Sequence, residues 1–331
     1  MKMEKAPVHQ GKYRDLGLEK ALKKIEEGEK CVIRFKCSSN KDVSFDDLIR
    51  GKIKINTSDI GDFIIAKDLN NPLYNFTCVI DDFEMNITHI IRGEEHIPNT
   101  PKQILLGEAL GFTIPNFAHL SLILGKDKRK LSKREGSTAV SDYLKQGYLP
   151  EAINNFIAFL GWNPGTEKEI YSMDELIQDF SINKISKSGA IFNIDKLDWM
   201  NGMYIRKMDI NELVQKCLPY LKQKEGIDNK KVVEAYKDRL KKLEDIAELT
   251  DYLYQDMLKY DKELLRWKDM TDEEIKESLN NALKLIQRTD NIQIELVEEA
   301  KKAPSVGSFM WPLRVALSGK KHLRGQLKLL K

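Results

Sequence analysis

The hydrophobic pattern of the chain changes near residue 125, and this change constrains the fold more than any other feature. Before it, short β-branched and aromatic runs lie between turn-forming residues, at 31–36 (CVIRFK), 62–66 (DFIIA) and 74–80 (YNFTCVI). Such runs predict β-strands. After it, apolar residues recur at helical spacing, and residues 209–303 predict a helix bundle. We therefore expect a strand-rich α/β part followed by an all-α part.

Other segments of the α/β part carry more local signals. Ser44–Ile49 predicts a turn or a short helix between strands. Thr100-Pro101 is typical of a helix start, and Gly111 of a helix end, so a helix is expected between them. His119–Leu124 (HLSLIL) predicts a buried strand.

The helical part begins at Pro150-Glu151, where a helix is expected to run to Gly161. Ser172 and Glu175 have the spacing of a capping box and predict the start of another helix. Further helical patterns cover 232–258 and 272–288.

Composition excludes several classes of protein. The formal charge of +3 is too small to indicate a nucleic-acid partner by itself. No apolar run approaches the roughly 18 residues that span a bilayer, so membrane insertion is not expected. The four cysteines have no C-x-x-C spacing and no histidine at ligand spacing, which predicts reduced cytoplasmic thiols and no protein-bound zinc. They are Cys31, Cys37, Cys78 and Cys217.

The most informative segment is a basic loop at 125–136, which has six basic and two acidic residues between two glycines. Within it, Lys130-Leu131-Ser132-Lys133-Arg134 follows an apolar run directly. Two ammonium groups and a guanidinium placed this way can bind a polyphosphate and stabilise the charge of a leaving pyrophosphate. A solvated basic turn is the alternative for such a cluster.

Residues 130–134 resemble the lysine-rich signature loop of class I aminoacyl-tRNA synthetases, and Arg134 stands where glutamyl-tRNA synthetases have arginine. Seven further segments resemble bacterial glutamyl-tRNA synthetases in order and spacing. They are VIRFK (32–36), FDDLIRG (45–51), YNF (74–76), DD (81–82), THIIRGEEHIPNTPKQILLGEALG (88–111), DYLKQGYLPEAINNFIAFLGWNPG (142–165) and KLDWMNGMYIR (196–206).

The resemblance implies an α/β catalytic remnant, the second half of a Rossmann-type domain with part of its insertion, followed by an all-α stem-contact and anticodon-binding region. The implied domains are 1–70 (the acceptor-binding insertion), 71–125 (the Rossmann-type half), 126–208 (the signature loop and stem contact) and 209–331 (the helical anticodon-binding domain). The basic segment 312–331 has six basic and no acidic residues, and it could contact tRNA phosphates or be a solvated helix end.

The resemblance also assigns site residues. For glutamate it implies Tyr74, Arg92 and Glu95, with Arg92 binding a substrate carboxylate. Taken alone, Arg92 would suit a surface ion pair with Glu94 or Glu95. For ATP it implies Lys133, Ser132, the backbone of Leu122 and Ile123, and His96. Lys133 is expected to make the main phosphate contact of catalysis, supported by Lys130 and Arg134.

The implied reaction is that of a glutamate–tRNA ligase. ATP, assisted by Mg²⁺, activates L-glutamate to glutamyl-adenylate, and the glutamyl group passes to the terminal adenosine of tRNA(Glu). Positioning and charge stabilisation dominate such catalysis. A cytoplasmic monomer without a protein metal ligand set is expected.

The chain departs from the family at both ends. It has no counterpart of the first strand, the His-Ile-Gly-His type turn and the following helix, and it stops soon after PLRVALSGKKH. Three explanations are open, ranked in this order: a fragment, the carboxy-terminal half of a split synthetase with a separate N-terminal catalytic half, and a non-catalytic tRNA-binding protein. A missing half would leave doubt about independent activity.

Overall fold

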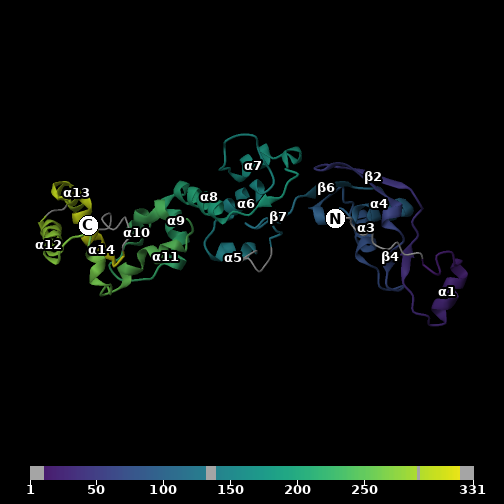
Figure 1. The fold of residues 1–331 in the computed structure, drawn as a ribbon, viewed down its shortest axis with the longest axis horizontal. Coiled ribbons are helices and arrows are strands. Elements are labelled where there is room, and N and C mark those ends of the chain that lie inside the picture. The colour runs from purple at the N-terminus through teal and green to yellow at the C-terminus, as the bar shows by residue number, and fades with distance from the viewer. Residues whose placement is uncertain (1–10, 132–138, 289–290, 321–331) are drawn as a thin grey trace. The chain divides into compact units, whose positions relative to one another are not determined.

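The computed structural model describes residues 11–131, 139–288 and 291–320, which form two compact units (Figure 1). The first unit comprises residues 11–131, 157–169 and 174–192. The described residues of the second unit are 139–156, 170–173, 193–288 and 291–320. None of the described helices is both long and apolar enough for a membrane span.

A four-stranded sheet in the order β3-β2-β6-β5 organises the first unit. β2 is antiparallel to β3, and β6 is parallel to both β2 and β5. β1 pairs with β4, and β7 with β8, as separate two-stranded ladders. The strands are β1 Ile33–Phe35, β2 Asp42–Asp47, β3 Gly51–Asn56, β4 Phe63–Ala66, β5 His89–Gly93, β6 Asn116–Leu120, β7 Ile123–Leu124 and β8 Ala190–Ile191.

Two helices of this unit, α3 and α4, pack against each other, and α4 also contacts β2. The helices of the unit are α1 Leu18–Glu26, α2 Thr57–Ile60, α3 Tyr74–Glu84, η1 Glu94–His96, α4 Thr100–Leu110, η3 Ile182–Lys184 and, apart from its first residue, α7 Met173–Asp179.

The helix expected between Thr100 and Gly111 is confirmed as α4. Pro101 lies in its first turn, and Gly111 ends it in the left-handed region at φ 72°. Its buried residues join the core of the unit, where Leu106 packs in one cluster with Val43 of β2 and Phe117 of β6.

The strand expected at 74–80 is wrong, because this segment is part of helix α3. Its β-branched and aromatic content suggested a strand, but Phe76, Val79 and Phe83 recur at helical spacing. Phe76 and Val79 pack on the core of the unit, and the Phe83 ring stacks on that of Phe112. Packing of this face therefore overrides the local strand preference.

The turn or short helix expected at Ser44–Ile49 is confirmed only for its last two residues, since residues 42–47 form strand β2 and the turn covers 48–50. Val43 and Asp47 are buried on one face while Ser44 and Asp46 are exposed. Phe45 shares that face, and its ring lies 5.6 Å from that of Phe117. Every second residue from Val43 to Asp47 therefore faces the core, which is the pattern of a strand with one buried face. The expected segment began at Ser44 and so left out Val43, the first residue of this pattern.

The buried strand expected at His119–Leu124 is confirmed only in part. β6 ends at Leu120, and β7 at Ile123–Leu124 pairs with a different strand, β8. Ile123 is exposed and so is no core residue.

The second unit is helical among its described residues. Its helices are α5 Val140–Lys145, α6 Pro150–Phe159 (whose last residues, from Ile157, belong to the first unit), α8 Ile194–Lys207, α9 Ile210–Cys217, η4 Leu218–Tyr220, α10 Asn229–Tyr236, η5 Lys237–Arg239, α11 Asp245–Thr250, η6 Asp251–Tyr254, η7 Lys262–Leu265, α12 Asp272–Arg288, α13 Ile292–Lys302 and α14 Val306–Ser318.

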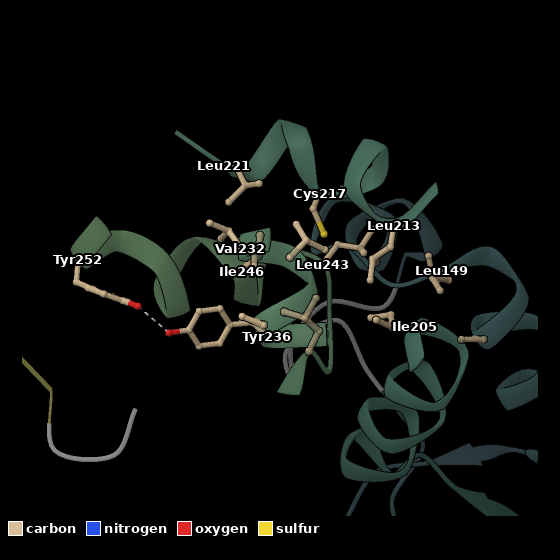
Figure 2. Close-up of a cluster of buried hydrophobic side chains, with 14 residues drawn as sticks. Leu149, Ile205, Leu213, Cys217, Leu221, Val232, Tyr236, Leu243, Ile246 and Tyr252 are labelled. Atoms are coloured by element: carbon tan, nitrogen blue, oxygen red, sulfur yellow. Dashed lines mark hydrogen bonds between the residues drawn. The ribbon is translucent and has the colours of Figure 1, made fainter. Parts of the chain in front are cut away.

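The expected helix starts at Pro150 and Asp272 are confirmed by α6 and α12, and α7 begins next to Ser172. The pattern at 232–258 is not one helix, because α10, η5, α11 and η6 divide it into short pieces. These pieces bury a shared core that includes Leu213, Cys217, Val232 and Ile246 (Figure 2). Figure 2 also shows the hydroxyl groups of Tyr236 and Tyr252, which lie 3.0 Å apart.

Gly147 connects α5 to α6 at a point where no side chain fits. Its φ is +85°, and a Cβ added there would lie 2.7 Å from Leu243 Cβ and 2.8 Å from Leu243 N. The same backbone approach lets Leu243 N donate a hydrogen bond to Gly147 O at 3.0 Å.

We expect Gly147→Ala to lower the free energy of unfolding by about 3 kcal/mol, because left-handed strain and a clash with backbone act together. Gly226→Ala is the matched control, since Gly226 has φ +84° but nothing within 4 Å of an added Cβ. This control should cost only about 1 kcal/mol. Urea unfolding followed by tryptophan fluorescence measures both, and equal losses would contradict the crowding at Gly147.

Candidate active site at the carboxyl edge of the sheet

The parallel strands β2, β5 and β6 end at a common edge of the sheet, where polar side chains gather. Asp47 ends β2, while Arg92 and His119 each stand one residue before the end of β5 and β6. Arg92 pairs in register with His119. Carboxyl edges of parallel strands are the usual ligand sites of open α/β sheets.

Arg92 is half-buried and makes three side-chain hydrogen bonds. Its Nε donates to His119 Nε2 at 3.2 Å, and its Nη2 donates to Thr100 Oγ1 at 2.7 Å and to Gln103 Oε1 at 2.8 Å. The guanidinium also lies 5.8 Å from the centre of the Phe117 ring. The alternative of a surface ion pair with Glu94 or Glu95 is wrong, because both glutamates pair elsewhere.

His119 and Asp47 form a fully buried pair beneath Arg92. His119 Nδ1 lies 2.6 Å from Asp47 Oδ2, and both side chains have no exposed surface. Burial lowers the pKa of His119 below its ordinary value, so the ring is neutral at pH 7. Burial alone would raise the pKa of Asp47, but hydrogen bonds from the Arg50 backbone and the His119 ring hold it below its usual range.

Gln103 and Thr100 come from the first turns of α4, next to the end of β5. Gln103 Nε2 donates to Asn75 Oδ1 at 3.2 Å and to Cys78 Sγ at 3.0 Å, both on α3. The amide therefore presents Oε1 to Arg92, and α3 is tied to the same network.

Tyr74 and His96, expected at the glutamate and ATP sites, are brought together. Tyr74 begins α3, and its ring lies 6.0 Å from that of His96 at the end of η1. His96 Nδ1 lies 3.3 Å from Asn99 Nδ2. Gln103 links Arg92 to Asn75, the neighbour of Tyr74, so these three expected residues share one region.

Glu94 joins Leu122 to Arg50. Glu94 Oε1 accepts from Leu122 N at 3.1 Å, and Oε2 lies 2.6 Å from Arg50 Nη2. Arg50 also donates to His119 O at 3.2 Å and to Lys187 O at 2.8 Å. The backbone N–H of Leu122, which is expected at the ATP site, thus already donates to Glu94.

Glu95 and Lys130, both expected site residues, form an ion pair at 3.0 Å. The Glu95 carboxylate folds back toward its own N–H and over Gly93, and these hydrogen bonds hold the pKa of Glu95 below its usual value. The contact joins η1 to the middle of the basic loop.

The first part of the basic loop is a short hairpin. Leu131 N donates to Ile123 O at 2.9 Å, and Leu124 and Lys130 form an antiparallel bridge. The predicted phosphate ligands Ser132, Lys133 and Arg134 lie outside the described residues.

Sequence reasoning missed Asp47, Arg50, Thr100, Gln103 and His119. Four of them are polar residues inside apolar or helical segments, where a buried polar group signals a fixed hydrogen-bond network. For His119 that signal was present in the buried strand expected at 119–124, whereas for Asp47 it appears only once residues 42–47 are identified as strand β2. Within the described ranges, no group of three or more metal-ligating side chains could hold an ion.

The buried histidine makes stability depend on pH. The unfolded chain takes up a proton at His119 as the pH falls below 6.5, before the folded chain does, so the free energy of unfolding decreases there. Asp47 raises the pKa of the ring, whereas burial, Arg92 and His96 lower it. The lowered pKa of Asp47 adds a further loss below about pH 4.

We expect wild type to lose about 1 kcal/mol more stability between pH 7 and 5 than His119→Gln, which lacks the titrating ring. Urea unfolding monitored by circular dichroism at both pH values provides the comparison. Parallel pH profiles for the two proteins would show that His119 is not the group responsible.

Comparison with known proteins shows the family to which the chain belongs. A family model described as "tRNA synthetases class I (E and Q), catalytic domain" matches residues 1–199, and one described as "Anticodon binding domain" matches residues 212–323. The glutamate–tRNA ligase of Carboxydothermus hydrogenoformans is 44% identical, with 96% of this chain and 69% of that protein covered. For the ligase of Aquifex aeolicus the values are 43%, 94% and 68%.

A solved structure is similar as well. The crystal structure of a glutamate tRNA ligase from Elizabethkingia meningosepticum, in complex with its amino acid, has a TM-score of 0.80 at 32% identity. The match covers 95% of this chain and 68% of that one. The chain therefore belongs to the class I tRNA synthetases of the glutamate and glutamine group, with an anticodon-binding domain after its catalytic domain.

Proposed function

We infer that the chain is a glutamate–tRNA ligase, which uses ATP to join L-glutamate to tRNA(Glu). Relatives with this name match almost the whole chain at 39–44% identity. Activity on these substrates follows from the family, and the roles of individual residues are our proposal.

The observation that supports the glutamate site best is the state of Arg92. Its three hydrogen-bond acceptors are all uncharged, and within the described part of the chain it makes no ion pair. A half-buried guanidinium without a carboxylate partner is suited to bind the carboxylate of a substrate. Nε and Nη2 are engaged, so Nη1 is the nitrogen that would donate to it.

In the first step, a carboxylate oxygen of glutamate bonds to the α-phosphorus of ATP, and the bond to the β-phosphate oxygen breaks. The products are glutamyl-adenylate and pyrophosphate. In the second step, a hydroxyl of the terminal adenosine of tRNA(Glu) attacks the glutamyl carbonyl carbon, and AMP leaves. The protein contributes mainly orientation and charge stabilisation.

Lys133, Lys130 and Arg134 are proposed to stabilise the phosphates, with Ser132 beside them. Lys130 can reach phosphate by leaving its pair with Glu95, since exposed ion pairs contribute only about 0–1 kcal/mol. Mg²⁺ would enter bound to ATP phosphates. Tyr74 and Glu95 complete the glutamate side, while His96, Leu122 and Ile123 are proposed for ATP.

Residues 126–208 and 209–331 are proposed to contact the tRNA stem and anticodon. Of the basic segment 312–331, the structure describes the part up to Lys320, whose Nζ lies 2.7 Å from Asp251 Oδ1. This lysine is therefore engaged within the protein. We propose a cytoplasmic monomer, and the assay below also tests for a separate amino-terminal polypeptide.

Glutamylation of tRNA(Glu) with ATP and labelled L-glutamate tests the function. It is measured for this chain alone and after mixing with the part of the Carboxydothermus ligase that lies outside the 69% matched here. We expect product from the chain alone or from the mixture, and product only from the mixture would identify a two-polypeptide enzyme. Binding of tRNA(Glu) without product in both would indicate a non-catalytic binding protein, and neither binding nor product would reject the proposal.

Lys133→Ala is expected to slow ATP–pyrophosphate exchange with glutamate and tRNA by about 100-fold, the usual loss when a transition-state donor is removed. Arg129→Ala is the control, because this arginine belongs to the same basic sequence segment, its side chain is 87% exposed, and among the described residues it pairs with Asp127 at 3.5 Å. Robust exchange by Lys133→Ala would refute the role of Lys133.

A further inference from the structure

A chain of hydrogen bonds runs from Asp47 through His119 to Arg92, and it begins with the fixed carboxylate of Asp47. Asp47 Oδ1 accepts from the backbone N–H groups of Ile49 at 3.0 Å, Arg50 at 2.8 Å and His119 at 3.3 Å. Its other oxygen, Oδ2, lies 2.6 Å from His119 Nδ1. Three backbone donors and full burial leave this carboxylate a single orientation.

The carboxylate in turn determines the tautomer of His119. A carboxylate only accepts hydrogen bonds, so Nδ1 must carry the ring proton. In a neutral ring Nε2 is then an acceptor, and it faces both Arg92 Nε at 3.2 Å and Thr100 Oγ1 at 3.1 Å. Asp47 does not contact Arg92, but through the tautomer of His119 it makes Arg92 the donor and His119 the acceptor of their hydrogen bond.

The remaining contacts of Arg92 complete its orientation. Thr100 Oγ1 and Gln103 Oε1 both accept from Nη2, so three of the five N–H groups of the guanidinium are used. Within the described residues no hydrogen bond of Nη1 is recorded, and its two N–H groups are left for a ligand.

We propose that Asp47 and His119 are positioning residues that hold the guanidinium of Arg92 in one orientation through a neutral imidazole, so that Nη1 donates to the carboxylate of the amino-acid substrate. This inference rests on the proposed function, in which Arg92 binds that carboxylate. Neither Asp47 nor His119 touches the substrate. Their effect is to remove orientations of a flexible side chain before the substrate arrives.

Two amide substitutions at His119 separate this role from a purely structural one. In His119→Asn the side-chain amide lies where Nδ1 was and can still donate to Asp47, but no acceptor reaches Arg92. In His119→Gln the longer amide places Oε1 where Nε2 was and can accept from Arg92, but it does not reach Asp47. His119→Asn thus keeps the hydrogen bond to Asp47, and His119→Gln keeps the hydrogen bond that orients Arg92.

L-Glutamate binding is measured by isothermal titration calorimetry with the full chain at pH 7.5, and stability by urea unfolding. We expect His119→Asn to weaken binding about 10-fold or more and His119→Gln by less than about 3-fold, as for loss or retention of one charge-assisted hydrogen bond. Stability should follow the opposite order, with His119→Gln the less stable variant because it leaves buried Asp47 without its ring donor.

The outcomes that overturn the inference are distinct from those that overturn the proposed function. If Arg92→Gln leaves glutamate binding unchanged, or if wild type binds no glutamate either alone or mixed with the unmatched part of the Carboxydothermus ligase, the proposed role of Arg92 fails and the inference fails with it. If Arg92→Gln abolishes binding but His119→Asn binds as wild type, only the positioning role is refuted. The same holds if the binding losses of the two His119 variants merely follow their losses of stability.

Discussion

The parallel register of β5 against β6 determines which side chains meet at the edge of the sheet. Because Arg92 lies opposite His119, guanidinium and imidazole point to the same side and reach each other. A slip of one residue would turn every side chain of β5 to the other face. The pairing of β2 with β6, at Asp47 and Phe117, brings the carboxylate into the same row. The register of the strands, more than the conformation of the loops, therefore determines which side chains form the candidate site.

The site combines two kinds of electrostatic contact with different energetic consequences. Arg92 is half-buried and donates to uncharged acceptors, and among the described residues no carboxylate forms an ion pair with it. Lys130 and Glu95 form an exposed ion pair, which water can replace at little cost. The proposed amino-acid side of the candidate site is thus prepared in advance, while Lys130 of the basic loop can exchange partners. This division suits a reaction in which pyrophosphate departs and the amino acid stays.

Much of the fold was accessible from sequence, but the site was accessible only in part. Helix α4 was marked by Pro101 and Gly111, whose local chemistry decides where a helix starts and ends. A turn or helix was predicted where β2 lies, and a strand where α3 lies. In both segments the structure is decided by burial of side chains against Phe117 and the rest of the core, and not by local propensity. Arg92, Tyr74, Glu95 and His96 came from family resemblance. The pairing of Asp47 with His119 spans 72 residues, and nothing local in sequence encodes such a hydrogen bond.

Arg50 has a consequence for how the first unit opens. Its guanidinium and backbone contact Glu94, the end of β6 and the segment at Lys187, which is 137 residues away in sequence. Segments held by one shared group open together rather than one at a time, because releasing any of them removes part of the support of the others. The amide hydrogens around residue 187 should therefore exchange with solvent in the same cooperative opening as those of the central strands, β2 and β6. This is expected although the chain passes through the second unit between β6 and residue 187.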